Sequence, residues 1–257
     1  MEAFCGIDVA CAKAKLLPVV VCVREGTRLR ALPLRMRGPI PPRGMGNRLS
    51  VDTVTRQNFA SAAVDYLAAV ERQFAVRIVE VAIDAPRSPS AGRRRAAERE
   101  MDRLGISCIA TPSYAQFEAI REKVATHLAA GGSETRLPHA NQLWMLVGFD
   151  LFNSLGTRYN CIEVFPNAIV HAVAPDAAHK STSHGFERQL QAVASAADWN
   201  PAELFAAAYG TRHDKLDAFM SAWIASLPLS QRVAYGDGAF DTIWSVRTST
   251  APLSILH

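Results

Sequence analysis

Several features that mark whole classes of protein are missing from this 257-residue sequence. No apolar run reaches the roughly 20 residues that a membrane-spanning helix needs. The opening residues, MEAFCGID, carry an early acid and lead straight into an apolar strand, so we expect no secretory signal peptide. Because there is no internal repeat, low-complexity tract or linker, we expect one domain over residues 1–257, with a mainly helical insertion at about 113–159.

Cysteine and histidine are present, but not in the spacings that bind metals or form disulfide frameworks. The number of cysteines is odd, no two form a CxxC pair, and most stand in apolar strand-like runs: Cys5, Cys11, Cys22, Cys108 and Cys161. This usage predicts a reduced, cytoplasmic protein in which cysteine behaves as a small apolar residue. The seven histidines show no HxxxH or HxH spacing, so zinc chemistry is a weak alternative.

The charge is modest overall and uneven along the chain. The net charge is +4, yet residues 24–48, here called the basic arm, hold seven arginines and the single acid Glu25, a local charge of +6. A basic segment of this kind is compatible with phosphate binding. The candidate substrate-binding residues in it are Arg28, Arg30, Arg35 and Arg37. The alternative is that the basic arm is simply a solvated loop.

The hydrophobic periodicity predicts an α/β protein with a mixed sheet. We expect strands at 3–9, 15–23, 27–36, 76–84, 106–112 and 160–166, and a final hairpin within 238–248. Helices are expected at 54–74, 91–104, over most of 113–159, at 183–197 and at 213–227. Apolar residues crowd more than one face of the second helix in the insertion, which indicates a buried helix or a partner surface, and hence a possible homodimer: Trp144, Met145, Leu146, Phe149, Leu151 and Phe152.

Acidic residues follow apolar strand runs at three places, Asp8, Asp84 and Glu163. If Asp8 and Asp84 end neighbouring parallel strands, their carboxylates meet at the edge of the sheet where α/β proteins bind ligands. Two close carboxylates repel each other unless a cation neutralises them. Mg²⁺ or Mn²⁺ is the hard, oxygen-preferring cation that suits such a site.

Two further acids, Asp214 and Asp217, lie on one face of the first turn of a predicted helix. Taken alone, this motif is better explained as helix capping, because acids are favoured at helix starts. Four acids at strand ends and a helix start are costly to bury together without a purpose, and we therefore predict a site.

In its order of motifs the chain resembles the predicted RNase H-like nuclease family known as domain of unknown function 429. The stretches that carry the resemblance are GIDVACAKAKL, VEVAIDAP, GRRRAAEREMDRLGISCIATPS, IEVFPNAIVHAV, HKSTSHGFERQLQAV and HDKLDAFMSAWIAS. The resemblance implies a ribonuclease H-like fold: a five-stranded mixed sheet in the order 3-2-1-4-5, flanked by helices, with Asp8 beside Asp84. Asp214 and Asp217 resemble the D-x-x-D end of the Holliday-junction resolvase branch, and Glu163 fits a position of the narrower family. The basic arm has no counterpart in the family pattern.

The function predicted from this resemblance and from the acids is metal-dependent hydrolysis of phosphodiester bonds in nucleic acid, DNA or RNA, at a two-metal site. Asp8 is expected to bridge the ions, Asp84 and Asp217 to hold one each, and Asp214 or Glu163 to complete the site. Further candidates for substrate binding are Lys13, Lys180 and Arg188, whereas Arg93, Arg94 and Arg95 are expected on a solvated helix face.

Two other functions stay open. GIDVACAKAKL is similar to the first phosphate loop of ATP-binding proteins of the actin and sugar-kinase type. The chain is short for two such lobes, however, and DGAF near Asp237 is a poor second phosphate loop. The remaining alternative is a binding module that keeps the fold and the basic arm without catalysis.

Overall fold

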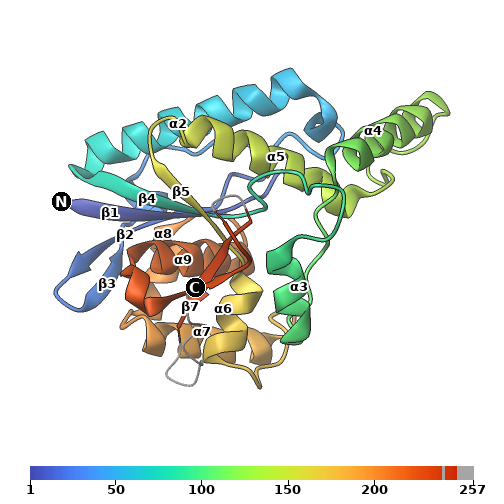
Figure 1. Cartoon of the computed structure of the whole chain (residues 1–257). Coiled ribbons are helices and arrows are strands. Elements are labelled where there is room, and N and C mark those ends of the chain that lie inside the picture. Colours follow the sequence, from blue (N-terminus) through green and yellow to red (C-terminus); the bar gives the residue numbers. More distant parts are fainter. Residues whose placement is uncertain (239–240, 248–257) are drawn as a thin grey trace.

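In the computed structural model, which describes residues 1–238 and 241–247, the described strands form one seven-stranded sheet (Figure 1). The spatial order is β3-β2-β1-β4-β5-β7-β6. The strands are β1 (Glu2–Asp8), β2 (Val19–Glu25), β3 (Arg28–Ala31), β4 (Arg77–Asp84), β5 (Asn160–Val164), β6 (Arg232–Tyr235) and β7 (Ile243–Val246).

Strands β1, β4, β5 and β7 are parallel to their neighbours in that series. Strand β2 is antiparallel to β1, β3 is antiparallel to β2, and β6 is antiparallel to β7. The carboxyl ends of the four parallel strands therefore meet at one edge of the sheet. The expectation of five strands was wrong, because β7 and β6 continue the sheet beyond β5. Pairing of β7 with β5 covers backbone groups that would otherwise stay open on an edge strand. Part of the hairpin predicted over 238–248 lies outside the described residues.

Helices α2 (Thr53–Phe74) and α5 (Ala140–Leu155) cover one face of the sheet, above it in Figure 1. Asp52 caps α2 by accepting a 2.7 Å hydrogen bond from the Thr55 amide, which satisfies one of the free donors at the helix start. Alternate residues of β1 face this layer, as the buried Ala3, Cys5 and Ile7 show. Burial of these apolar side chains drives the packing of the layer.

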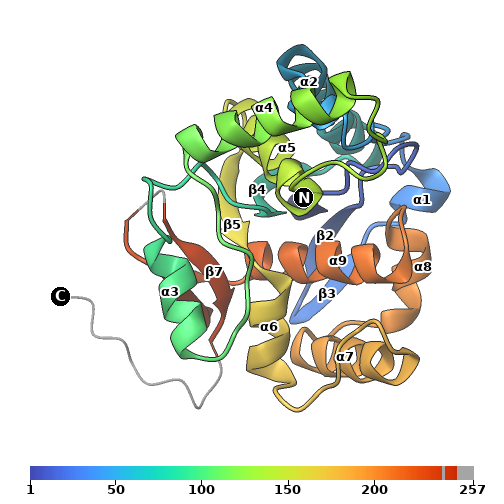
Figure 2. The same ribbon diagram turned by 90° about the vertical axis from the view of Figure 1, so that its right-hand side faces the viewer.

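The opposite face is covered by α6 (Pro166–Val173), α7 (Ser183–Ala196), α8 (Leu204–Ala207) and α9 (Arg212–Ser226), which lie together in Figure 2. Helix α9 lies directly on β1 at Gly6. A Cβ atom added at Gly6 would stand 2.0 Å from the Ala218 carbonyl oxygen and 2.2 Å from the Ala222 amide nitrogen. Only glycine permits so close an approach of strand and helix.

The helical insertion contains α4 (Tyr114–Ala129) and α5. These two helices share a small apolar cluster in which the Phe117 and Phe149 rings pack edge to face at 5.5 Å. The predicted crowding of α5 reflects burial within the chain: the six apolar residues named above are buried, apart from the partly exposed Trp144. Helix α4 projects from the rest of the molecule (Figure 1).

The remaining elements correct several expectations. The third strand is shorter than 27–36, because Pro33 lacks an amide donor and α1 (Leu34–Arg37) begins after it. Residues 106–112 form no strand, and Ser90 and Ser113 make only an isolated bridge there. Pro166 ends β5 as predicted and also begins α6, a helix that the sequence did not suggest.

Helix α3 (Ala96–Arg103) is shorter than the predicted 91–104 and lies beside β7 (Figure 2). Short 3₁₀ turns occupy Leu49–Val51, Pro201–Glu203 and Leu229–Gln231. Within the part of the chain that the structure describes, no helix is both long and apolar enough to cross a membrane.

Candidate active site

The first two predicted carboxylates stand side by side. Asp8 is the last residue of β1 and pairs in parallel register with Asp84, the last residue of β4. This confirms the predicted adjacency at the carboxyl edge of the sheet. Because side chains alternate along a strand, Asp8 shares the face of Gly6 and Asp84 shares the face of Ala82, which is the face that α9 covers.

Helix α9 brings a third carboxylate to this place. Asp217 precedes Ala218, the residue whose carbonyl lies against Gly6, and its side chain is buried. The pKa values of both Asp8 and Asp84 are raised well above the usual range, mainly by burial and next by the negative charge of Asp217. Burial also raises the pKa of Asp217. These are the shifts expected of like charges held together away from water.

Lys180 supplies the nearby positive charge. Its ammonium forms an ion pair with Asp217 Oδ2, and the attraction of Asp217, Asp84 and Asp8 raises the pKa of Lys180 despite burial, which lowers it. The charge of Lys180 thus acts on all three carboxylates. The other oxygen of Asp217, Oδ1, is buried and has no hydrogen-bond partner among residues 1–238 and 241–247. A buried carboxylate oxygen in that state is favourable only if a cation or a donor reaches it.

Asp214 fixes the start of α9. Thr211 and Asp214 form a capping box, in which the Thr211 amide donates to Asp214 Oδ2 at 2.7 Å. Lys15 Nζ donates to Asp214 Oδ1 at 2.8 Å. Burial opposes ionisation, but the hydrogen bonds from Lys15 and Thr211 outweigh it and lower the pKa of Asp214. The capping interpretation of Asp214 is confirmed, and Lys15 is a partner that the sequence analysis missed.

Glu163 lies on the other face of the sheet. Its neighbours in β5, Ile162 and Val164, pack in the α9 layer, so the alternation sends Glu163 the opposite way. Both of its oxygens accept from Arg95, at 2.7 and 2.8 Å, and one also accepts from the Arg87 amide at 2.9 Å. Burial raises the pKa of Glu163, and Arg95 opposes that shift. Glu163 is thus paired with Arg95 and does not join the cluster of three aspartates.

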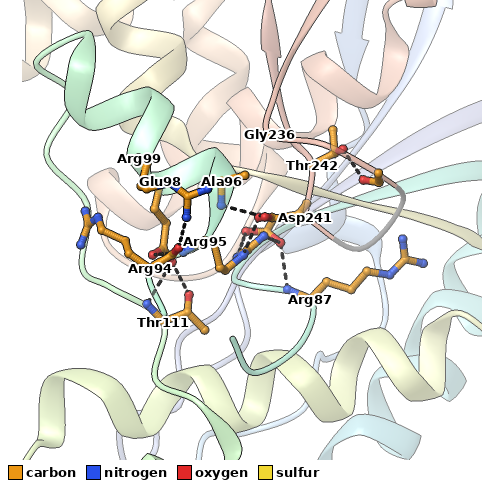
Figure 3. A network of polar contacts seen from close by, with 12 residues as sticks. Arg87, Arg94, Arg95, Ala96, Glu98, Arg99, Thr111, Gly236, Asp241 and Thr242 are labelled. Atoms are coloured by element: carbon orange, nitrogen blue, oxygen red, sulfur yellow. Dashed lines mark hydrogen bonds and ion pairs between the residues drawn. The ribbon is translucent and has the colours of Figure 1, made fainter. Parts of the chain in front are cut away.

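The expectation that Arg95 lies on a solvated helix face was wrong. The Arg95 side chain is buried, and its guanidinium binds a second carboxylate besides Glu163. Nε donates to Asp241 at 3.1 Å, and Asp241 also accepts from the Ala96 amide at 2.7 Å (Figure 3). Arg94 forms an ion pair with Asp102 at 2.6 Å, and Arg93 is exposed. No local pattern in the run of three arginines distinguishes the one that becomes buried.

The other predicted substrate-binding residues are dispersed. Lys13, in the turn after β1, and Arg188, on α7, are exposed. Arg28 pairs with Glu203 at 3.2 Å and Arg30 pairs with Glu25, at the end of the sheet away from Asp8. The remaining two lie in α1, where the Arg35 guanidinium stacks 4.1 Å from the centre of the Phe205 ring and Arg37 is exposed.

Two pockets meet at Asp84. The first, here called the polar pocket, has a volume of about 410 Å³, and Asp84, Lys180 and Asp217 line it. Its wall also includes His179 and Gln189, which the sequence analysis did not select. The second, here called the apolar pocket, has a volume of about 280 Å³ and lies between α3, α5 and the ends of β4, β5 and β7. A ligand at the carboxylates can therefore extend in either direction.

The donor set is one of hard oxygens, which suits Mg²⁺ or Mn²⁺. In residues 1–238 and 241–247, no group of three or more acidic, histidine or cysteine side chains is already arranged to hold a metal ion. The Lys180 ammonium contacts the Asp217 carboxylate that such an ion would need. The charge of the three aspartates and the unpaired Asp217 Oδ1 nevertheless fit a divalent cation, provided that Lys180 moves aside.

Comparison with known proteins gives one match. No curated protein and no solved structure matches the chain. Residues 6–234 match the family described as "Protein of unknown function (DUF429)", a range that includes Asp8, Asp84 and Asp217 as well as Lys180. Since the match spans most of the sequence, the chain belongs to the DUF429 family.

Proposed function

We propose that this protein is a metal-dependent phosphodiesterase of the ribonuclease H-like superfamily that hydrolyses nucleic acid. The observation that carries the proposal is the convergence of Asp8, Asp84 and Asp217 at the carboxyl edge of the sheet, with the Lys180 ammonium paired to Asp217. The order of the first five strands in the sheet, 3-2-1-4-5, supports the superfamily assignment.

The charge balance favours a divalent cation. Three ionised aspartates and one lysine leave two negative charges, and burial makes those charges costly unless they are neutralised. Without a metal, the raised pKa values favour protonation of part of the cluster. Magnesium or manganese ions at a two-metal site would activate the attacking water and stabilise the charge of the leaving oxygen.

The residues of the chain have distinct tasks in this proposal. Asp8 and Asp84 hold the ions from rigid strand ends, and Asp217 completes the site from α9. Asp214 holds the first turn of α9 in place through Thr211 and Lys15, and is a positioning residue. Once Lys180 leaves Asp217, its ammonium is free to bind a phosphate oxygen of the substrate, which neutralises charge beside the scissile bond.

Metal binding is the first test. Mg²⁺ or Mn²⁺ should raise the melting temperature of the wild type, because a ligand that binds only the folded state stabilises it. Asp8→Asn should lose most of that gain. Asp65→Asn changes an exposed aspartate on α2 and should retain it. Equal metal responses in Asp8→Asn and wild type would exclude Asp8 as a ligand.

Activity is the second test. The purified protein with Mn²⁺ or Mg²⁺ should cleave at least one of single-stranded DNA, branched DNA, RNA and an RNA–DNA hybrid. Cleavage should disappear with a chelator and in Asp84→Asn, while circular dichroism shows an intact fold. Phosphate release from ATP without cleavage of any nucleic acid would favour the kinase-like alternative instead. Absence of both activities, together with nucleic-acid binding, would favour the non-catalytic module.

A further inference from the structure

The apolar pocket beside Asp84 has no task in the hydrolysis described above. Its walls combine an aromatic side chain, Trp144, with apolar side chains that include Ile109, Met145 and Phe165. Ile109 is 47% exposed although it is a large apolar residue. An open apolar pocket of about 280 Å³ is close to the lower end of the range for small-molecule sites, and suits one flat ring system.

The buried polar groups of this pocket already have partners. Arg95 is bound to Glu163 and Asp241, and Glu98 accepts from both the amide and the hydroxyl of Thr111, at 2.9 and 2.6 Å (Figure 3). A ligand in the pocket therefore meets few free hydrogen-bonding groups. Recognition there depends on stacking and apolar contact, which every nucleobase can supply.

Cationic side chains lie on two sides of the pocket, one of them Lys180 beside the carboxylates. The polar pocket shares Asp84, Ser107 and Phe165 with it, and contains Lys180. On the other side, a third pocket of about 450 Å³ shares Thr111 with the apolar pocket. The third pocket is lined by Arg93 and Lys123, two exposed side chains that form no ion pair with the described residues. Once the carboxylates are neutralised and Lys180 is free of Asp217, an apolar pocket with a cationic side chain on each side matches a base between two phosphates.

We propose that the apolar pocket accepts one unstacked base of a single-stranded nucleic acid, whose backbone runs from Lys180 at the carboxylates towards Arg93 and Lys123. A base inside a duplex is stacked on both faces and cannot enter without being extruded at an energetic cost. The site should consequently prefer single strands, with little dependence on base identity. This inference rests on the proposed function for the role of the carboxylates.

The test measures binding, in a chelator, of a labelled single-stranded 12-mer, its duplex and the corresponding nucleoside monophosphate. The wild type should bind the single strand at least about tenfold more tightly than the duplex. Trp144→Ala should weaken single-strand binding by on the order of tenfold, as for other base-stacking aromatics. Ile109→Ala should weaken it in the same direction without affecting the fold, because Ile109 is exposed. Leu104→Ala is the matched control, since Leu104 is similarly exposed but lies outside the pocket.

Single-strand affinities that are equal in wild type, Trp144→Ala and Ile109→Ala would overturn the inference, as would equal affinity for the duplex. Monophosphate affinity as high as that of the 12-mer would overturn the strand path from Lys180 to Arg93. Metal-dependent cleavage is measured on the same proteins. If the wild type cleaves nucleic acid but the pocket variants bind the single strand as tightly as the wild type does, the base pocket alone is refuted. If the pocket variants bind the single strand more weakly but the wild type cleaves nothing, the proposed hydrolysis alone is refuted.

Discussion

The contact between Gly6 and α9 gives the most direct test of how the fold assembles the carboxylates. In Gly6→Ala, the added methyl group would lie 2.0 Å from the Ala218 carbonyl oxygen, whereas ordinary contact begins near 3.4 Å. Helix α9 must therefore retreat by about 1.4 Å. The atoms in the way belong to the helix backbone, so no side-chain rotation can relieve the clash.

The expected cost lies at the upper end for an overpacked core, about 3 kcal/mol in the free energy of unfolding. For a protein of this size, that cost corresponds to a fall in melting temperature of roughly 6–12 °C. Movement of α9 also displaces Asp217, which is adjacent to Ala218, so Mg²⁺ should stabilise Gly6→Ala less than it stabilises the wild type.

Thermal unfolding followed by circular dichroism, with and without Mg²⁺, measures both effects. Cys5→Ala is the control, because Cys5 lies on the same strand but faces the α2 layer. This variant should lose only the contacts of a small buried side chain, about 1 kcal/mol, and should keep the full metal response. A Gly6→Ala protein that melts within about 2 °C of the wild type would refute the close packing of α9 on β1.

Three other outcomes are expected. In a chelator, the raised pKa of Asp8 means that the folded state binds its proton more tightly than the unfolded state does, so this carboxyl contributes stability that is lost as the pH rises above about 4 through the folded-state pKa. Asp8→Asn should therefore be more stable than wild type at pH 8, and its free energy of unfolding should depend less on pH. Urea unfolding at several pH values measures this, and identical plots of stability against pH for the two proteins would contradict it. Arg95→Met leaves Glu163 buried without its partner and should lower the free energy of unfolding by about 3–5 kcal/mol, much of which the double variant with Glu163→Gln should recover. Urea unfolding measures this, and a double variant whose loss of stability equals the sum of the two single losses would argue against the ion pair. Replacing the four candidate arginines of the basic arm with glutamine should weaken nucleic-acid binding and flatten its dependence on salt, because fewer counterions are released, and an unchanged salt slope would mark the basic arm as a solvated loop.

Much of the framework followed from local sequence patterns. The apolar runs that end in Asp8 and Asp84 predicted β1 and β4, and the helical spacing of residues 54–74 and 213–227 predicted α2 and α9. Such patterns are reliable because side-chain periodicity depends only on neighbouring residues. The adjacency of Asp8 and Asp84, in contrast, needed two sources: the shared pattern of an apolar run followed by Asp, and the strand order that the family resemblance implies.

The tertiary structure decided which charged residues meet. Glu163, like Asp8 and Asp84, follows an apolar run, yet strand alternation turns this carboxylate to the other face of the sheet, where Arg95 binds it. A shift of one residue along a strand reverses the face, and a sequence pattern does not reveal which face the partner strand will present. The pairing of Lys180 with Asp217, and of Lys15 with Asp214, likewise joins residues far apart in the chain. Local periodicity fixes the elements, whereas contacts between them depend on how the layers pack, and the site consists of those contacts.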